Sequence, residues 1–222
     1  MIHTALRRAG SAIGRALYRP DLRGLENIPA SGPVLLASNH LSFCDSVAIP
    51  LAVPRPLRFL AKAEYFDAPG LKGRASRTAF TALGAVPVRR GGGREAVDAL
   101  DLGLSVLKDG GAFAIYPEGT RSPDGRLYRG RTGVAHLALT SGAPVVPVAV
   151  QGTDRVQPIG AKVPRIAPVG LSFGEPLDFS FGYGHMKTGR ARRVVTDEVM
   201  DAIAALSGQE RAAGYNPRSA ED

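Results

Sequence analysis

The chain has no tryptophan, a single cysteine and only 6% aromatic residues among its 222 positions. The lone Cys44 excludes an internal disulfide framework and a cysteine-cluster zinc site, and it indicates a reducing compartment. Few aromatic side chains, no zinc-finger spacing and no RNP-type strand argue against nucleic-acid binding. With 44% hydrophobic and 22% charged residues, the composition is globular and can bury a full core.

Long apolar runs are also missing. The N-terminus is basic, but no apolar stretch follows it, so the sequence predicts no cleavable signal peptide. The longest uncharged stretch, residues 132–153, contains Gly142, Pro144 and Pro147, and the prolines prevent a single spanning helix. If the protein meets a membrane, we expect it to lie on the surface.

Positive charge is abundant and unevenly placed. The chain has 28 Lys and Arg against 20 Asp and Glu, a net charge of +8, and only five of the basic residues are Lys. Residues 1–24 carry five Arg against one Asp, and residues 55–94 carry nine basic residues against two acids. This pattern favours an anionic partner, either an anionic bilayer or a phosphorylated small molecule. A solvated face without a partner is the alternative.

Short apolar runs alternate with helical patterns along the chain. The alternation predicts an α/β fold, with one mostly parallel or mixed sheet covered by helices on both faces. We expect a single domain over 21–206 and a disordered tail over 207–222. Strands are predicted at 33–38, 57–61, 84–88, 112–116, 144–150 and 169–173, and the main helices at 70–82, 94–108, 133–140 and 192–206.

Within the basic segment 1–20, residues 2–17 predict an amphipathic helix. Its apolar positions form one stripe at helical spacing, with arginines on the other side. Such a helix either packs on its own domain or lies in a membrane interface, and the sequence leaves both placements open. The stripe consists of Ile2, Leu6, Ala9, Ile13 and Leu17, and the arginines are Arg8, Arg15 and Arg19.

The most informative pair is His40 and Asp45, which follow the strand at 33–38. Ser42 and Asp45 form a capping-box pattern, which predicts Ser42 as the N-cap of a short helix. The chain would then reverse between His40 and Asp45, so that the carboxylate reaches the imidazole. A histidine held by an acid is a general base, although in isolation the same spacing also fits a capping Asp beside a loop histidine.

Two further segments carry anion-binding groups. Residues 116–122, Tyr-Pro-Glu-Gly-Thr-Arg-Ser, follow a predicted strand, and Arg121 offers a planar fork for a phosphate. The predicted strand at 84–88 ends before Arg89 and Arg90, and strand carboxyl ends are where open α/β sheets bind ligands.

Taken in order, these blocks together with Val145-Val146-Pro147-Val148 resemble the glycerol-phosphate and lysophosphatidate acyltransferase family, which is PlsC-like. The resemblance covers about residues 22–180 and implies that His40 deprotonates an acceptor hydroxyl while Asp45 orients it. It further implies transfer of a fatty acyl chain from acyl-CoA or acyl-ACP to lysophosphatidate, with glycerol 3-phosphate or another lyso-lipid as alternative acceptors.

The resemblance also implies the remaining site. Arg90 or Arg89, with Arg121, would hold the acceptor phosphate, and the other residues would shape the pocket and the acyl site: Glu118, Gly119, Thr120 and Pro147. No cofactor is expected, because the thioester is already activated. The partners would be the two substrates and an anionic membrane surface, with the protein peripheral on the cytoplasmic side of the cell membrane.

The sequence also departs from the family pattern and allows rival hypotheses. Residues 87–90 read Pro-Val-Arg-Arg where the family often has Asp or Asn before the Arg, and Tyr116 stands where Phe is usual.

Gly170-x-Ser172-x-Gly174 matches a hydrolase elbow, but Pro176 prevents the helix that the elbow requires. A metal site from His40, Asp45, Glu118 and His136 lacks any supporting ligand spacing. A non-catalytic basic module on anionic membranes explains the charge alone.

Overall fold

The structure is a computed structural model that describes residues 2–88 and 93–217. Seven strands of the described residues form one sheet in the order β1-β7-β6-β2-β5-β3-β4. All neighbouring strands are parallel except β6 and β7, which run antiparallel, so the sheet is mixed as expected. The strands are β1 (Asp21–Arg23), β2 (Val34–Ser38), β3 (Leu57–Lys62), β4 (Ala85–Val88), β5 (Ala112–Ile115), β6 (Val145–Gln151) and β7 (Gly170–Phe173).

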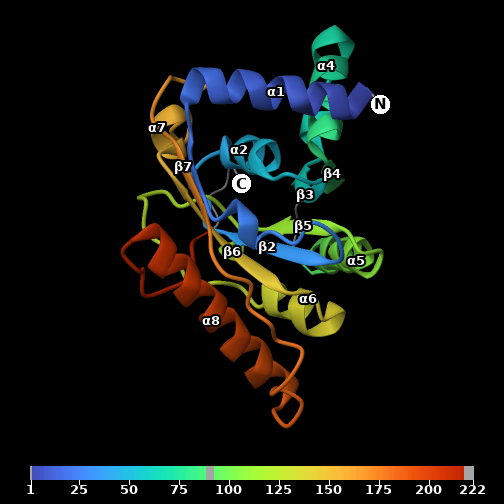
Figure 1. Cartoon of the computed structure of the whole chain (residues 1–222), viewed down its shortest axis with the longest axis vertical. Coiled ribbons are helices and arrows are strands. Elements are labelled where there is room, and N and C mark those ends of the chain that lie inside the picture. The colour runs from blue at the N-terminus through green and yellow to red at the C-terminus, as the bar shows by residue number, and fades with distance from the viewer. Residues whose placement is uncertain (1, 89–92, 218–222) are drawn as a thin grey trace.

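Helices cover both faces of this sheet (Figure 1). One face carries α2 (Asp45–Ala52), α3 (Glu64–Asp67) and α4 (Gly70–Leu83), and the other carries α5 (Arg94–Lys108), α6 (Gly133–Ser141) and α8 (Thr188–Ser207). Strand β2 shows why, because all five of its residues are buried and successive side chains enter opposite core layers. The predicted α/β class is therefore confirmed.

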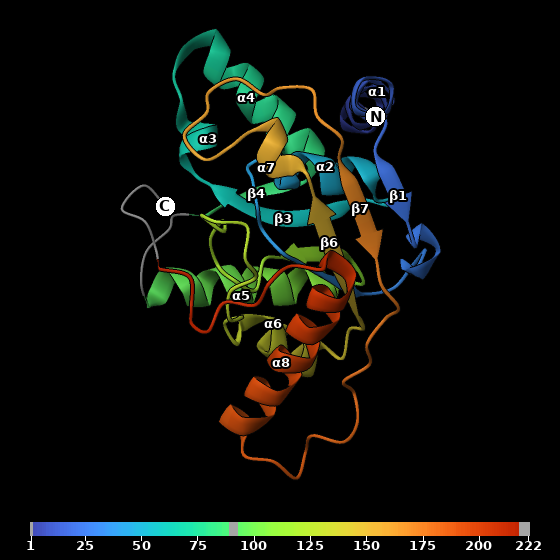
Figure 2. The same ribbon diagram turned by 90° about the vertical axis from the view of Figure 1, so that its left-hand side faces the viewer.

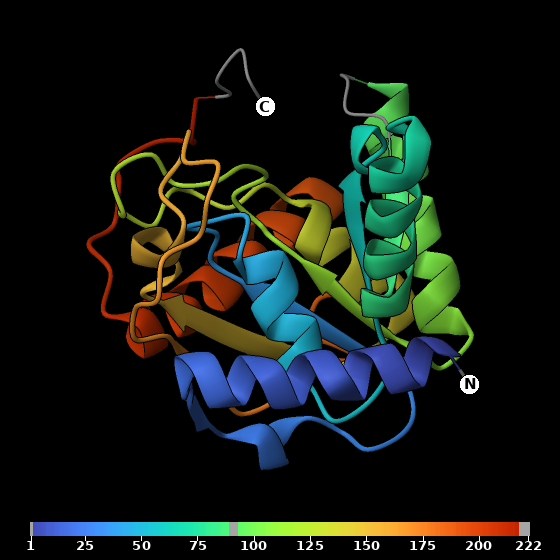
Figure 3. The same ribbon diagram turned by 90° about the horizontal axis from the view of Figure 1, so that it is seen from above.

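Helix α1 (Ile2–Tyr18) lies across α2 and α4, outside the helices that cover the sheet (Figures 1 and 3). The face of α1 that contacts α2 carries small and polar residues. There the Ser11 hydroxyl donates to the Leu51 carbonyl at 3.0 Å. A Cβ on Gly10 would lie 3.3 Å from the Leu51 side chain, so the glycine permits this close approach. Ile13 and Leu17 of the apolar stripe point away from the domain and are 60% and 53% exposed.

The structure adds short elements that the sequence did not indicate: β1, the 3₁₀ turn η1 (Leu25–Asn27), α3 and α7 (Thr153–Val156). Each has only three or four residues, too few to establish a periodicity. The expected disordered tail is wrong over residues 208–217. The backbone N–H of Leu127 donates to the carbonyl of Glu210 at 2.8 Å, and that of Arg129 donates to Gly214 at 2.9 Å.

Candidate active site

His40 lies two residues beyond the end of β2 and is only 6% exposed. Its Nδ1 lies 2.8 Å from Oδ2 of the fully buried Asp45. The same oxygen accepts the backbone N–H groups of Leu41 at 2.7 Å and Ser42 at 2.9 Å. These bonds fix the carboxylate against the imidazole, so the chain reversal expected between the two residues is present and leaves Nε2 for a substrate.

Half of the expected capping box forms. Asp45 accepts from the Ser42 backbone as the pattern predicts, but α2 begins at Asp45 with Cys44 as its N-cap, so Ser42 as N-cap is wrong. The Ser42 hydroxyl instead donates to the Gln157 carbonyl at 2.8 Å and accepts from the Cys44 N–H at 3.2 Å. The Ser42 hydroxyl thus bonds to the segment after α7 and to the Cys44 N–H instead of accepting the Asp45 N–H, as a capping box would require.

Tyr116 stacks on the His40 ring, with the ring centroids 3.8 Å apart and the planes inclined by 9°. Its hydroxyl lies 3.1 Å from that of Ser46 on α2. Burial, and then the negative charge of Asp45, raise the pKa of Tyr116, so its hydroxyl stays protonated. No role for Tyr116 is predicted from the sequence, although its position directly after β5, the strand next to β2, is a signal that could have indicated one.

Glu118 holds the backbone on both sides of the site. Its Oε1 accepts the His40 N–H at 3.1 Å, and its Oε2 accepts the Tyr128 N–H at 2.9 Å. The parallel register that pairs Ala37 with Ile115 brings these residues together, since His40 and Glu118 each lie three positions further on. Glu118 therefore positions the histidine, and both of its oxygens are engaged by backbone groups.

Burial raises the pKa of Glu118 to about 7, despite the two backbone hydrogen bonds that lower it. Since this folded-state pKa exceeds its ordinary value of 4.5, the contribution of Glu118 to stability is full below that value and is lost as pH rises through 7. The loss is on the order of 3 kcal/mol. Gln resembles the neutral acid and cannot ionise. From acid to alkaline pH we therefore expect the free energy of unfolding of Glu118→Gln to fall less than that of the wild type.

Denaturant titrations of both proteins across this pH range measure the difference, and the paired comparison removes the titration of all other groups. An equal pH dependence of unfolding for wild type and Glu118→Gln would contradict the assignment.

Arg121 lies in the loop that follows Glu118, and the segment after α8 supports this loop. The Ser122 N–H donates to the His40 carbonyl at 2.7 Å, which ties the loop to residues 40–45, the proposed catalytic turn. The amide of Asn216, only 2% exposed, donates to the Arg121 carbonyl at 2.9 Å. A second support is Gln209, whose amide donates to the Gly125 carbonyl of this loop at 2.7 Å while its Oε1 accepts from the Asn39 amide at 2.7 Å. Neither Asn216 nor Gln209 was predicted, because a polar tail carries no local signal for such contacts.

The other predicted residues are distributed as follows. Gly119 has a φ of 83°, and a Cβ there would lie 3.1 Å from Nε of Arg131, so this turn needs glycine. Thr120 is buried beside it, at 2% exposure. Pro147 lies in β6 on the α8 face of the sheet, where it contacts Gly174. The predicted phosphate ligands Arg89 and Arg90 lie outside the described residues.

An apolar cavity of about 400 Å³ adjoins the catalytic turn. Phe43 and Cys44, which lie between His40 and Asp45, form part of its wall. The rest comes mainly from α1, β1, α2, α7, β7 and the segment between α7 and β7, including Tyr18, Val47 and Leu171. Its volume is that of a small-molecule pocket, and Pro147 is not among its lining residues.

The structure gives little support to the rival sites proposed from the sequence. Ser172 lies inside β7, paired with Ala149 of β6, and residues 174–187 after it form no helix. His136 is on α6, where its Nδ1 lies 2.8 Å from Nη2 of Arg192. Within residues 2–88 and 93–217, no three His, Cys, Asp or Glu side chains gather as ligands for a metal ion.

Residues 19–151 match the family model described as Acyltransferase, and the chain belongs to this family. A chloroplastic 1-acyl-sn-glycerol-3-phosphate acyltransferase of Brassica napus, BAT2, is 36% identical over 146 residues, 65% of this chain and 41% of that protein. One from Borreliella burgdorferi is 28% identical over 131 residues, 59% of this chain and 50% of that protein. The chain thus spans half or less of the length of these relatives.

The same fold occurs in a solved structure. The crystal structure of the 1-acyl-sn-glycerophosphate (LPA) acyltransferase PlsC from Thermotoga maritima matches with a TM-score of 0.68 and 27% identity, covering 94% of this chain and 81% of that one. The resemblance inferred from the ordered sequence blocks is therefore confirmed at the level of family and fold.

Proposed function

We propose that this protein transfers a fatty acyl group from an acyl thioester to the free hydroxyl of lysophosphatidate and forms phosphatidate. The buried His40–Asp45 pair, 2.8 Å apart at the end of β2, is the observation that carries the proposal. The printed names of the relatives and of the matching crystal structure support the choice of acceptor.

In the proposed reaction, Nε2 of His40 removes the proton of the acceptor hydroxyl while Asp45 stabilises the imidazolium. The hydroxyl oxygen attacks the thioester carbonyl, an ester C–O bond forms, and the C–S bond breaks. The proton held by His40 then passes to the leaving thiolate. Tyr116 and Glu118 take no proton in this scheme; they hold the ring plane and the backbone of His40.

We further propose that the apolar cavity receives an acyl chain. Its walls begin at Phe43 and Cys44, three and four residues after His40, so a chain held there would end near the catalytic turn. The donor is acyl-CoA or acyl-ACP.

Arg121 is proposed to bind the acceptor phosphate. We expect Arg121→Ala to raise the acceptor KM about 10- to 100-fold and to change kcat less, because a phosphate contact is present in both ground and transition states. Arg126→Ala is the matched control from the same loop. The Arg126 guanidinium pairs with Asp124 at 2.7 Å, so its loss should leave KM near the wild-type value. Equal effects of the two substitutions would remove Arg121 from the site.

Thiol release from oleoyl-CoA tests the reaction itself, with lysophosphatidate, glycerol 3-phosphate or no acceptor. Release that depends on lysophosphatidate supports the proposal, and release that depends on glycerol 3-phosphate selects the alternative acceptor. Release without any acceptor would indicate a thioesterase instead. If nothing is released, acyl-ACP is tested as the donor, and failure with both donors would overturn the proposal.

A membrane surface is the proposed source of the lipid acceptor. No described helix is long and apolar enough to cross a bilayer. In α1 the face with small and polar residues contacts α2, while Ile13 and Leu17 on the other side of the helix point outward, and an exposed apolar stripe is what an interfacial helix presents to lipid. We therefore propose a peripheral protein on the cytoplasmic side of the cell membrane, bound through an anionic surface. This placement satisfies both options that the sequence left open for α1.

A further inference from the structure

Residues 157–168, between α7 and β7, form a compact exposed loop that is closed by its own hydrogen bonds. The Arg165 N–H donates to the Val156 carbonyl at 2.7 Å, and the Gln157 amide donates to the Ala161 carbonyl at 2.9 Å. This loop lies beyond residues 19–151, which match the family model. We call it the 157–168 loop.

Apolar side chains of this loop point into solvent. Ile159, Val163 and Ile166 are 45%, 74% and 73% exposed. They are three of the nine large hydrophobic side chains that are exposed in the described residues, and Ile13 and Leu17 of α1 are two more. More than half of the exposed apolar side chains thus belong to two neighbouring segments, which is typical of an interaction surface.

Basic side chains alternate with the apolar ones. Lys162 and Arg165 lie between Ile159, Val163 and Ile166 in the sequence, and the loop itself contains no acid. Both basic residues are exposed. Apolar side chains flanked by cations that reach outward match a lipid interface with anionic headgroups.

The 157–168 loop and α1 border the same cavity. Lys162 and Pro164 line it from one side, and Arg15 and Tyr18 line it from α1. The base of the loop also touches the catalytic turn, since the Gln157 carbonyl accepts from the Ser42 hydroxyl at 2.8 Å. Figure 2 shows the loop on the face of the molecule that also carries the end of α1 next to β1.

We propose that the 157–168 loop is a second membrane-binding element, which inserts Val163 and Ile166 into an anionic phospholipid bilayer while Lys162 and Arg165 bind the headgroups. The loop and α1 would then hold the cavity and the catalytic turn against the lipid surface. This inference rests on the membrane surface proposed above and adds the segment that penetrates it.

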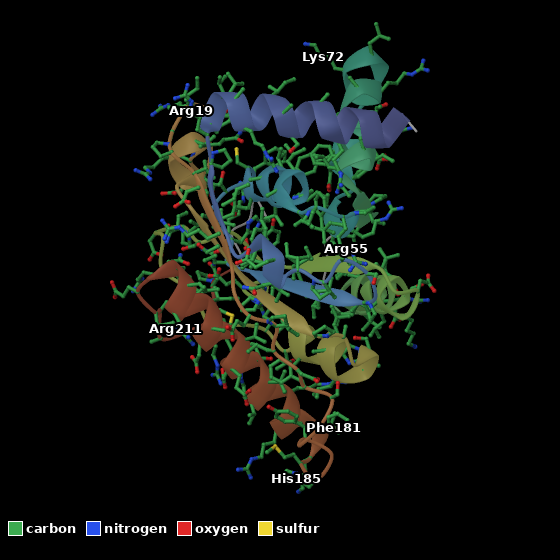
Figure 4. The ribbon with its side chains drawn as sticks, viewed as in Figure 1. Arg19, Arg55, Lys72, Phe181, His185 and Arg211 are labelled. Carbon is green, nitrogen blue, oxygen red and sulfur yellow. The ribbon has the colours of Figure 1, made fainter. Side chains whose placement is uncertain are left out.

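The absence of tryptophan permits a direct test. The single indole of a Val163→Trp variant is the only one in the chain. With vesicles of phosphatidylcholine and phosphatidylglycerol, we expect a blue shift of its emission and quenching by lipids brominated in the acyl chains. Phe181→Trp is the matched control, because Phe181 is 86% exposed and lies at the opposite end of the molecule from Arg19 (Figure 4). It should show neither change.

A second measurement avoids the bulky probe. We expect Val163→Ser with Ile166→Ser to weaken vesicle binding about tenfold, and Phe181→Ser to leave it unchanged. Quenching that is equal at 163 and 181, or vesicle binding unaffected by the double substitution, would overturn the proposal. A response of the Val163→Trp emission to an acidic carrier protein but not to vesicles would also overturn it.

Acyl transfer between short-chain, water-soluble substrates separates this inference from the proposed reaction. The double variant should keep wild-type turnover there, since neither Val163 nor Ile166 lines the cavity. Insertion without any transfer by the wild type would refute the reaction and leave the loop assignment standing. Transfer without insertion would refute the loop assignment alone.

Discussion

His40→Ala is expected to lower kcat for acyl transfer by about a thousandfold or more while the protein remains folded. General-base catalysis contributes about 10²–10⁴-fold, and the substitution also removes the ring that positions the acceptor hydroxyl. The backbone bonds of residue 40 to Glu118 and Ser122 do not depend on the side chain and should persist. Acceptor-dependent thiol release and thermal unfolding, measured on the same preparation, test both parts.

His136→Ala is the matched control for this experiment. His136 lies on α6, on the other face of the sheet from α2, and it contacts Arg192 rather than the catalytic turn. We expect its replacement to leave kcat unchanged. A His40→Ala protein that keeps more than about a tenth of the wild-type kcat would exclude His40 as the general base.

Asp45→Asn is the second substitution with a large expected effect. Oδ2 of Asp45 accepts from His40, Leu41 and Ser42, and an amide oxygen can replace it in the two backbone bonds. The negative charge that stabilises the imidazolium is lost, so we expect kcat to fall about 10²–10⁴-fold. The acceptor KM should change little, because Asp45 does not contact the acceptor in the proposed mechanism.

Asp45→Ala separates chemistry from folding. Alanine leaves the buried donors of the catalytic turn without an acceptor, at about 1–3 kcal/mol for each. The Ala variant should therefore lose stability as well as activity, whereas the Asn variant should lose mainly activity. Asp197→Asn, on α8 beside Arg193, is the control for a charge removed far from the turn. An Asn variant with near wild-type kcat would refute the role of Asp45.

Most of the sheet could be predicted because its strands are short and mostly apolar runs. Strands β2 and β6 have this pattern, and such runs are stable only when both faces of the sheet are covered. The His40–Asp45 pair could also be predicted, because a five-residue separation and a turn signal are local properties of the sequence. Strand β1 could not be predicted, since it has a single apolar residue, Leu22, and it forms by pairing with β7.

The contacts around the pair could not be predicted. Glu118 was expected to shape a phosphate pocket, but the register between β2 and β5 makes it a hydrogen-bond acceptor for the His40 backbone. Tyr116 stacks on His40 for the same reason. Register depends on the packing of side chains from several elements, and no single segment of the chain encodes it.

The sequence by itself determined the fold class, the His40–Asp45 pair and the amphipathic pattern of residues 2–17, because each depends on the order of residues within segments of the chain. Only the tertiary structure decided which face of α1 points outward, since a small, polar face around Gly10 and Ser11 can pack as closely as an apolar one. It likewise decided that residues 208–217 are ordered. Their backbone groups find partners on the loop at 127–129, more than 80 positions earlier in the chain.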